Sequence, residues 1–181
     1  IAVAASQGDV VIHEFVAKDH DMLLLKFSEM GVNYHMVDQR TIHIMPAEAP
    51  LKAVNIQTQP YPGLPSDLQA PFAVLMTQAE GKSQIFEIMY EGRLNYLFEL
   101  QRMGAEVGIR DPHVGQVEGP TRLHGTDVIS FDIRAGATIL IAALIAEGTT
   151  TIGRVEHIDR GYEFFDKRLN SLGANMQRVE E

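Results

Sequence analysis

The stretch "LIAEGTTTI" (residues 144–152) decides the fold, because it joins the small-residue end of a helix to a strand-like run through a single glycine. The same order occurs twice more, in "AVAASQGDVVI" (2–12) and "LMTQAEGKSQI" (75–85). Self-similarity at intervals along a chain indicates a fold built from repeated units. The sequence therefore predicts three copies of one supersecondary unit.

A second glycine pattern follows each of these stretches. It consists of an amphipathic helix, a glycine and an alternating run, as in "KFSEMGVNY" (26–34), "ELQRMGAEV" (99–107) and "LNSLGANMQ" (169–177). The distance between the two glycines is 23, 23 and 25 residues (Gly8 to Gly31, Gly81 to Gly104, Gly148 to Gly173). A residue just after a helix often needs a positive φ, which glycine adopts without a steric penalty. We interpret all six as helix C-cap glycines, which report architecture and not chemistry.

The complete unit is predicted to run strand, helix, strand, helix, strand, strand. In the middle copy these elements are expected at 52–58, 66–81, 83–90, 93–104, 105–110 and 113–119, the last two as a hairpin. The three copies occupy about 1–51, 52–125 and 126–181 and form one α/β domain. The last copy lacks its final strand. Alignment of Gly8 with Gly148 places Ile1 opposite Ile141, in the middle of a helix, so we expect the first copy to be truncated and the chain to be a piece of a longer polypeptide.

Composition excludes several classes of function. The chain has 181 residues, 45% of them hydrophobic, which is enough for one domain with a core. It has no cysteine, which excludes disulfides, thiolate metal sites and a cysteine nucleophile within these residues. A formal net charge of −9 argues against a nucleic-acid partner. The longest apolar run (138–146) is too short to span a membrane, and the seven histidines never show ligand spacing on one helix, so no metal or cofactor is expected.

Charged residues stand where three helices are predicted to begin. Ser66 is expected at an N-cap with Asp67 in the first turn, and the pairs Asp132 with Arg134 and Asp159 with Arg160 open two later helices. An acid at a helix start complements the helix dipole, whereas an arginine opposes it. Two such arginines suggest a bound anion held by guanidinium groups and exposed amides. The alternative is that each arginine pairs with its neighbouring aspartate.

Several long motifs resemble one known family. They are "YPGLPSDLQAPF" (61–72), "YEGRLNYLFELQRMGAEV" (90–107), "DIRAGATILIAALIAEGTT" (132–150) and "HIDRGYE" (157–163) with "LNSLGANMQRV" (169–179). Their order and content are similar to the C-terminal half of UDP-N-acetylglucosamine enolpyruvyl transferases (1-carboxyvinyltransferases). The resemblance covers 1–179 and implies an inside-out α/β barrel in each of two domains. It also implies a cytoplasmic enzyme of peptidoglycan and cell-wall biogenesis, a process tied to cell shape and the cell cycle.

The resemblance also implies roles for individual residues. Asp67 matches the proposed base for the sugar 3-hydroxyl, and Arg134 and Arg160 match the arginines that bind phosphoenolpyruvate. The further substrate-binding positions are Ser66, Met89, Tyr90, Arg93 and Asp132. Ser66, Tyr90 and Gly92 stand where the family usually has threonine, phenylalanine and asparagine.

The implied partners are UDP-N-acetylglucosamine, phosphoenolpyruvate and an N-terminal domain of the same polypeptide. In the family that domain supplies the proton donor, and it is absent from this chain, so we expect the isolated chain to be inactive. Two alternatives remain. One is the half of a shikimate-phosphate enolpyruvyl transferase. The other is a non-catalytic domain of the same fold that binds a nucleotide sugar or a protein.

Overall fold

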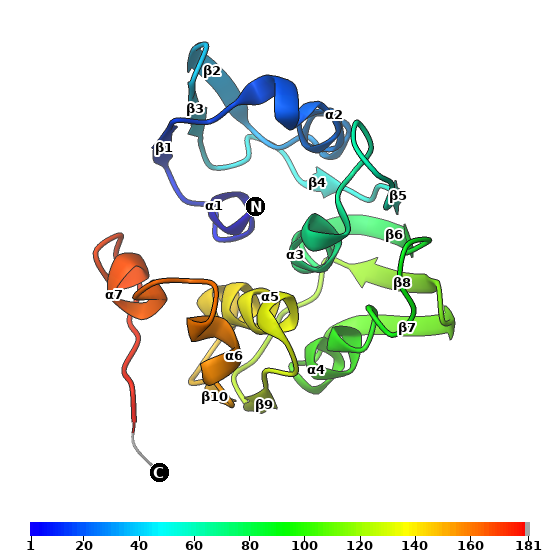
Figure 1. The fold of residues 1–181 in the computed structure, drawn as a ribbon, viewed down its shortest axis with the longest axis vertical. Helices are drawn as coiled ribbons and strands as arrows, with labels where there is room; N and C mark the ends of the chain where they lie inside the picture. The colour runs from blue at the N-terminus through cyan, green and yellow to red at the C-terminus, as the bar shows by residue number, and fades with distance from the viewer. Residues whose placement is uncertain (180–181) are drawn as a thin grey trace.

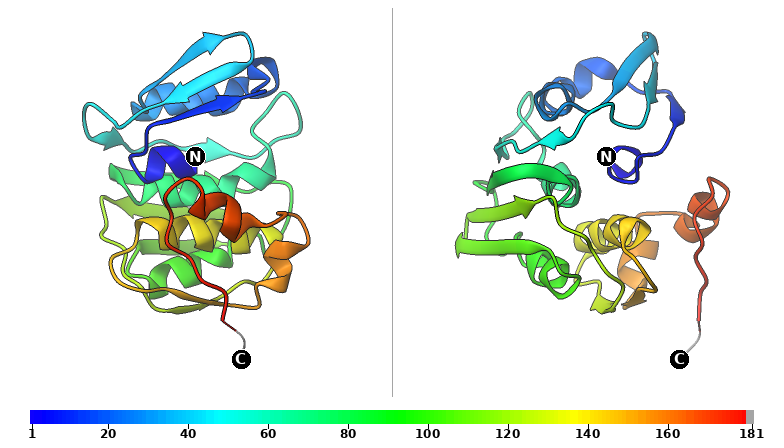
Figure 2. Two further views of the ribbon diagram at one scale, coloured as in Figure 1. Left: turned by 90° about the vertical axis from the view of Figure 1, so that its left-hand side faces the viewer. Right: turned by 180° about the vertical axis from the view of Figure 1, so that it is seen from behind.

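The computed structural model describes residues 1–179 and has an α/β fold in which sheets surround a central group of helices (Figure 1). Helices α1 (Ala2–Ala5), α3 (Ser66–Met76) and α5 (Ile133–Ile145) contact one another in the middle. Both further views show the sheets outside these three helices (Figure 2). This arrangement is the expected inside-out α/β barrel.

Each of the three units contributes one central helix. The first unit also contains β1 (Val10–His13), the short helix η1 (Ala17–Asp19), α2 (Asp21–Met30), β2 (Tyr34–Asp38) and β3 (Thr41–Ile44). The second contains β4 (Leu51–Lys52), β5 (Ile56–Gln57), β6 (Ala79–Phe86), α4 (Tyr96–Arg102), β7 (Glu106–Asp111) and β8 (Val114–Gly119). The third contains β9 (Asp127–Ile129), β10 (Thr151–Gly153), α6 (Glu156–Asp159) and α7 (Phe165–Asn170).

Strand pairing repeats from one unit to the next. In the first unit β1 and β2 are both antiparallel to β3, and in the second β6 and β7 are both antiparallel to β8. The strand before the central helix is parallel to the strand after it, as β4 and β5 are to β6 and β9 is to β10. The threefold repeat predicted from the glycine pattern is therefore confirmed, as is the hairpin of β7 and β8.

Helix α3 is the centre of the core. Its five residues from Phe72 to Met76 are completely buried, and Phe72 packs against Phe27 of α2 with ring centroids 5.9 Å apart. A helix that is apolar on nearly all sides must be surrounded by other elements. This burial fixes α3 firmly and therefore fixes the residues at its exposed start.

The glycine interpretation holds in part. Gly31 caps α2 in the left-handed conformation with φ +81°, and Gly104 has φ +94° two residues after α4. Gly81 instead lies inside β6, because α3 ends at Met76 and residues 79–81 pair with β4 and β8. The predicted helix 66–81 was therefore too long, since sheet pairing prevails over helix continuation. After α1 it is Gln7, with φ +53°, and not Gly8 that takes the left-handed conformation.

Of the three predicted helix starts, those of α3 and α5 are correct and the one at Asp159 and Arg160 is wrong. Pro65 occupies the N-cap of α3, so Ser66 is the first helical residue and does not cap. Arg160 is the residue that ends α6, and the next helix begins five residues later at Phe165. The helix-dipole argument therefore does not apply to Arg160. Asp132 stands at the start of α5 as predicted, and the structure shows that it is the N-cap, with a side chain that accepts hydrogen bonds from the N–H groups of Arg134 and Ala135.

Candidate active site

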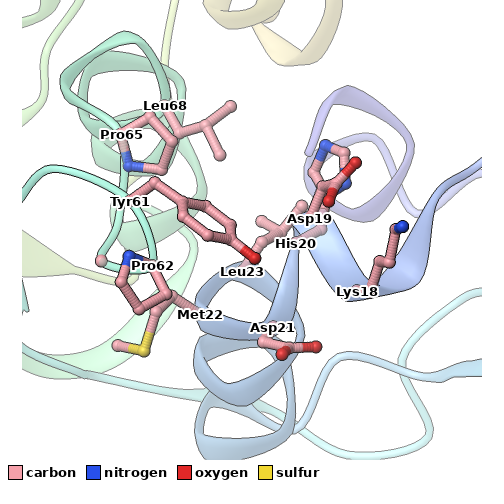
Figure 3. A pocket seen from close by; sticks show the side chains of 11 residues that line it. Lys18, Asp19, His20, Asp21, Met22, Leu23, Tyr61, Pro62, Pro65 and Leu68 are labelled. Carbon is pink, nitrogen blue, oxygen red and sulfur yellow. The ribbon is translucent and has the colours of Figure 1, made fainter.

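The segment before α3 rests on the start of α2. Tyr61 and Pro62 face Met22 and Leu23 across a small pocket of about 10 Å³ (Figure 3). Gly63 is required in this turn, because a Cβ there would approach the Gln59 side chain to 2.3 Å. The loop therefore has a fixed path into α3.

Asp67 lies in the first turn of α3 and reaches out of the core. Its side chain is 71% exposed. Oδ1 of Asp67 lies 3.0 Å from Nη1 of Arg134, which donates a hydrogen bond to it. In the sequence, one complete repeat separates these two residues. The packing of α3 against α5 brings them together.

Arg134 is held by the N-terminus of α5. The Asp132 carboxylate caps that helix through two N–H groups at 2.8 and 3.0 Å, and its Oδ1 also lies 3.6 Å from Nε of Arg134. Asp132 thus orders the helix start and faces the guanidinium at the same time. The side chain of Arg134 is 30% exposed, so it has access to solvent at the site.

Arg93 approaches the same carboxylate from the loop after β6. Its Nη1 lies 3.9 Å from Oδ1 of Asp67, and its guanidinium carbon lies 4.4 Å from the centre of the Tyr90 ring. Gln69 of α3 donates a hydrogen bond to the Arg93 carbonyl at 3.2 Å. A cation over an aromatic face is attracted by the ring electrons. Arg93 is therefore fixed by α3 on one side and by Tyr90 on the other.

Glu87 organises this end of β6. It is completely buried, and its carboxylate accepts hydrogen bonds from the Thr58 hydroxyl at 2.9 Å and the Ser66 hydroxyl at 2.7 Å. It also accepts from the N–H groups of Met89 at 2.9 Å and Tyr90 at 3.2 Å. A buried charge is tolerated only when such donors surround it. Glu87 thus connects the start of α3 to the loop that carries Met89 and Tyr90, whose side chains are largely exposed.

A pocket of about 60 Å³ opens between the starts of α3, α4 and α5. Ser66, Gln69, Arg93, Asp132 and Arg134 are among its lining residues. Nη1 of Arg93 and Nε of Arg134 are buried and form no hydrogen bond with any described residue. Each of these nitrogens faces a carboxylate at 3.6–3.9 Å without a hydrogen bond to it, so both donors can still bond to an anionic ligand at this pocket.

Arg160 stands apart from this cluster. It is exposed after α6, and the ion pairs formed within residues 1–179 do not include it. Tyr162, two residues on, lies in the electrostatic field of Asp67: burial, with a smaller contribution from that carboxylate, raises the pKa of Tyr162 above its usual value. The structure brings Asp67, Arg93, Asp132 and Arg134 together, and it shows no contact between these residues and Arg160.

The alternative that each arginine pairs with its neighbouring aspartate holds in part for Arg134, which lies 3.6 Å from Asp132, and does not hold for Arg160. Asp132 is occupied by the α5 amides, and the shortest ion pair of Arg134 is with Asp67. Asp159 is bound by Arg178 and not by Arg160. The cluster therefore combines an exposed carboxylate, suited to accept a proton, with guanidinium groups, suited to bind a carboxylate or phosphate.

Comparison with known proteins identifies the family of this chain. The model of the family described as EPSP synthase (3-phosphoshikimate 1-carboxyvinyltransferase) matches residues 1–169. The chain belongs to this family. Enolpyruvyl transferases are also its structural neighbours: the enolpyruvyl transferase NikO from Streptomyces tendae superimposes with a TM-score of 0.87 at 29% identity, covering 97% of this chain and 42% of NikO.

Curated relatives carry the name UDP-N-acetylglucosamine 1-carboxyvinyltransferase. The one from Elusimicrobium minutum is 44% identical over 179 residues, and the one from Halothermothrix orenii is 38% identical over 180. The alignments cover 98% and 99% of this enolpyruvyl-transferase-family chain and 42% of each relative, so the chain spans about two fifths of their length. The predicted resemblance is confirmed. No helix among residues 1–179 is long and apolar enough to cross a membrane.

The sequence prediction missed the buried polar residues of the site. Gln69 is one of them: its buried side chain accepts a hydrogen bond from the Tyr96 hydroxyl at 2.7 Å and donates one to the Arg93 carbonyl. The sequence analysis also predicted no role for Glu87. A signal for it existed, because a lone acid in the apolar run "IFEIMY" (85–90) must be exposed or fully bonded.

Proposed function

We propose that this chain is the catalytic half of an enolpyruvyl transferase that moves the enolpyruvyl group of phosphoenolpyruvate to the 3-hydroxyl of UDP-N-acetylglucosamine, with release of phosphate. This reaction would be the first committed step of peptidoglycan synthesis in the cytoplasm. The observation that carries the proposal is the exposed Asp67 carboxylate beside Arg93 and Arg134, at a pocket with two unpaired guanidinium nitrogens. The names of the curated relatives support the choice of sugar acceptor.

The arginines would bind the small substrate. Phosphoenolpyruvate carries a carboxylate and a phosphate, and the planar guanidinium of Arg93, Arg134 or Arg160 can hold either group through two parallel hydrogen bonds. An acidic protein repels anions at long range, so a local group of cations is needed to bind one. The buried donors of Arg93 and Arg134 satisfy that need.

Asp67 would accept the proton of the sugar hydroxyl. The hydroxyl oxygen bonds to the central carbon of phosphoenolpyruvate while a proton adds to its methylene carbon, which gives a tetrahedral ketal. Loss of a proton from that methyl group and departure of phosphate then restore the double bond. An ordinary carboxylate is too weak a base to ionise an alcohol beforehand, but it can take the proton as the new bond forms.

The contact between Asp67 and Arg134 suggests how binding and catalysis are coupled. Arg134 donates a hydrogen bond at 3.0 Å to Oδ1 of Asp67, the carboxylate that would accept the proton. A bound carboxylate or phosphate would compete for Arg134 and release Asp67. Asp132 would keep Arg134 oriented during the exchange, since it faces Nε at 3.6 Å and is itself fixed by the helix N–H groups.

The remaining predicted residues would bind the sugar nucleotide. Met89 and Tyr90 present exposed side chains at the end of β6, where Glu87 fixes their backbone. Ser66 is tied to Glu87, so its role would be to hold the start of α3 in place.

Residues 1–181 would act as one domain of three units (about 1–51, 52–125 and 126–181). Because the chain spans only about two fifths of its relatives, we propose that a second, N-terminal domain closes over the site and donates the proton.

Phosphate release by the complete polypeptide tests this function. We expect release from phosphoenolpyruvate with UDP-N-acetylglucosamine as acceptor and none with shikimate 3-phosphate. The 181-residue chain alone is expected to release none with either acceptor, because nothing then excludes water or supplies the second proton. Release with shikimate 3-phosphate alone would instead support the other enolpyruvyl acceptor, and turnover by the 181-residue chain would contradict the half-site proposal.

A further inference from the structure

The residues after α7 return to the segment that carries Arg160. Helix α7 and the chain beyond it run along one side of the molecule (Figure 2). From this geometry we propose that Arg178 is a positioning residue: it occupies the carboxylate of Asp159 and thereby leaves the neighbouring Arg160 free to bind a substrate anion. The inference rests on the proposed role of Arg160 and adds a residue that has no assigned function.

Arg178 binds two aspartates at once. Its Nη1 and Nη2 donate to the two oxygens of Asp159 at 2.8 and 2.7 Å, and Nη2 also donates to Asp166 at 3.0 Å. Single exposed ion pairs contribute little, but bidentate geometry and shared partners are the conditions under which they matter. These hydrogen bonds lower the pKa of both carboxyl groups, so both stay ionised.

The two aspartates stand at the two ends of one short segment, residues 160–165. Arg178 therefore fixes the ends of the segment that holds Arg160 and Tyr162. Within the segment Phe164 has φ +47°, a conformation that a non-glycine residue keeps only when its surroundings enforce it. The Tyr162 and Phe165 rings stack with centroids 4.7 Å apart, which orders the segment further.

The chain that carries Arg178 is itself anchored. Asn170 donates its side-chain amide to the Met176 carbonyl at 2.9 Å, and its side-chain oxygen accepts from the Met176 N–H at 2.9 Å. This pair of bonds resembles a strand pairing and places Arg178 within reach of Asp159. The position of Arg178 is thus determined by α7 and does not depend on the ion pair alone.

The ion pair of Arg178 with Asp159 determines whether a carboxylate competes with substrate for Arg160. Asp159 directly precedes Arg160 in the chain, so loss of Arg178 would leave an ionised carboxylate without its partner one residue from the Arg160 guanidinium. An anionic substrate would then need to displace that carboxylate. With Asp159 held by Arg178, the guanidinium of Arg160 needs no internal partner.

Chemical modification of arginine tests this on the 181-residue chain. Phenylglyoxal reacts with free guanidinium groups, and mass spectrometry of peptides gives the rate at each arginine. In the unaltered chain we expect Arg160 to react faster than Arg178. In Arg178→Gln the rate at Arg160 should fall about threefold, which is within the range that an exposed ion pair can supply. In Arg178→Gln with Asp159→Asn the rate should return to its original value, because the carboxylate adjacent to Arg160 has been removed.

Arg168 is the internal control, because it is exposed on α7 and its rate should be the same in all variants. An unchanged rate at Arg160 in Arg178→Gln would overturn the proposal. A double variant as slow as Arg178→Gln would also overturn it, since the effect would then come from lost structure and not from charge. Protection of Arg160 by phosphoenolpyruvate in the unaltered chain is measured separately: its absence would argue against the substrate role of Arg160 and would leave the ion-pair result interpretable.

Discussion

Replacing Asp67 by asparagine in the complete enzyme is expected to lower kcat by about 10²–10⁴-fold, which is the usual contribution of a general base. The amide keeps the shape of the side chain and can still accept a hydrogen bond from Arg134, but it cannot take a proton. A base acts in the transition state, so KM for phosphoenolpyruvate should change much less than kcat. Steady-state phosphate release at several concentrations of each substrate gives both constants.

Asp21→Asn is the matched control for this variant. Asp21 is also an exposed acid in the first turn of a helix, but it begins α2 and is not part of the cluster around Arg134. Its replacement should leave kcat unchanged. If Asp67→Asn retained a third or more of the original kcat, Asp67 would not be the base.

Glu87→Ala is expected to produce the largest loss of stability of any single change at the site. Removal of this fully buried carboxylate takes a partner from two hydroxyls and two backbone N–H groups, of which the Thr58 hydroxyl is in a buried bond and the other three are in partly buried bonds. Each unsatisfied buried group costs about 1–3 kcal/mol, so the free energy of unfolding should fall by at least about 3 kcal/mol. Urea denaturation followed by circular dichroism measures this change.

Two further variants distinguish the loss of the buried acceptor from the general effect of removing an acid from β6. Glu87→Gln keeps the shape and one good acceptor, so its loss should be only about 1 kcal/mol. Glu80→Ala removes an exposed acid from the same strand and should have almost no effect. If Glu87→Ala were no more destabilising than Glu80→Ala, the buried carboxylate would not hold the start of α3 to the end of β6.

The architecture could be predicted from the sequence because the pattern of helices, glycines and strands is local and occurs three times. Gly31 and Gly104 follow helices at positions with a positive φ, which glycine adopts without a steric penalty. The near-equal spacing of the glycine pairs indicates the repeat. The prediction that helix 66–81 ends at Gly81 was wrong. Gly81 does have a positive φ, but it lies in strand β6, which pairs with β4 and β8. Pairing between strands far apart in sequence is not visible in a local pattern.

A site residue was predictable only where its role depends on its immediate neighbours in the sequence. Asp132 shows its capping role from its place before an alanine-rich helix. Arg160 was assigned to a helix start because "DRGYE" (159–163) resembles one, whereas α6 ends there and leaves a five-residue gap before α7. The partners that decide the site are distant: Asp67 with Arg134, and Glu87 with Ser66. Such contacts follow from the packing of α3, α5 and β6, and no spacing rule within one segment encodes them.

The most direct test of the central claim is a titration of the 181-residue chain with phosphoenolpyruvate, followed by NMR of the arginine side-chain Nε–H signals. The claim is that this chain by itself holds the substrate anion at the starts of α3 and α5. We expect the signals of Arg93, Arg134 and Arg160 to shift together with one binding curve, while those of Arg110 and Arg122, which lie elsewhere and have their own partners, stay in place. Shifts of equal size at Arg122, or none at Arg93 and Arg134, would contradict the account.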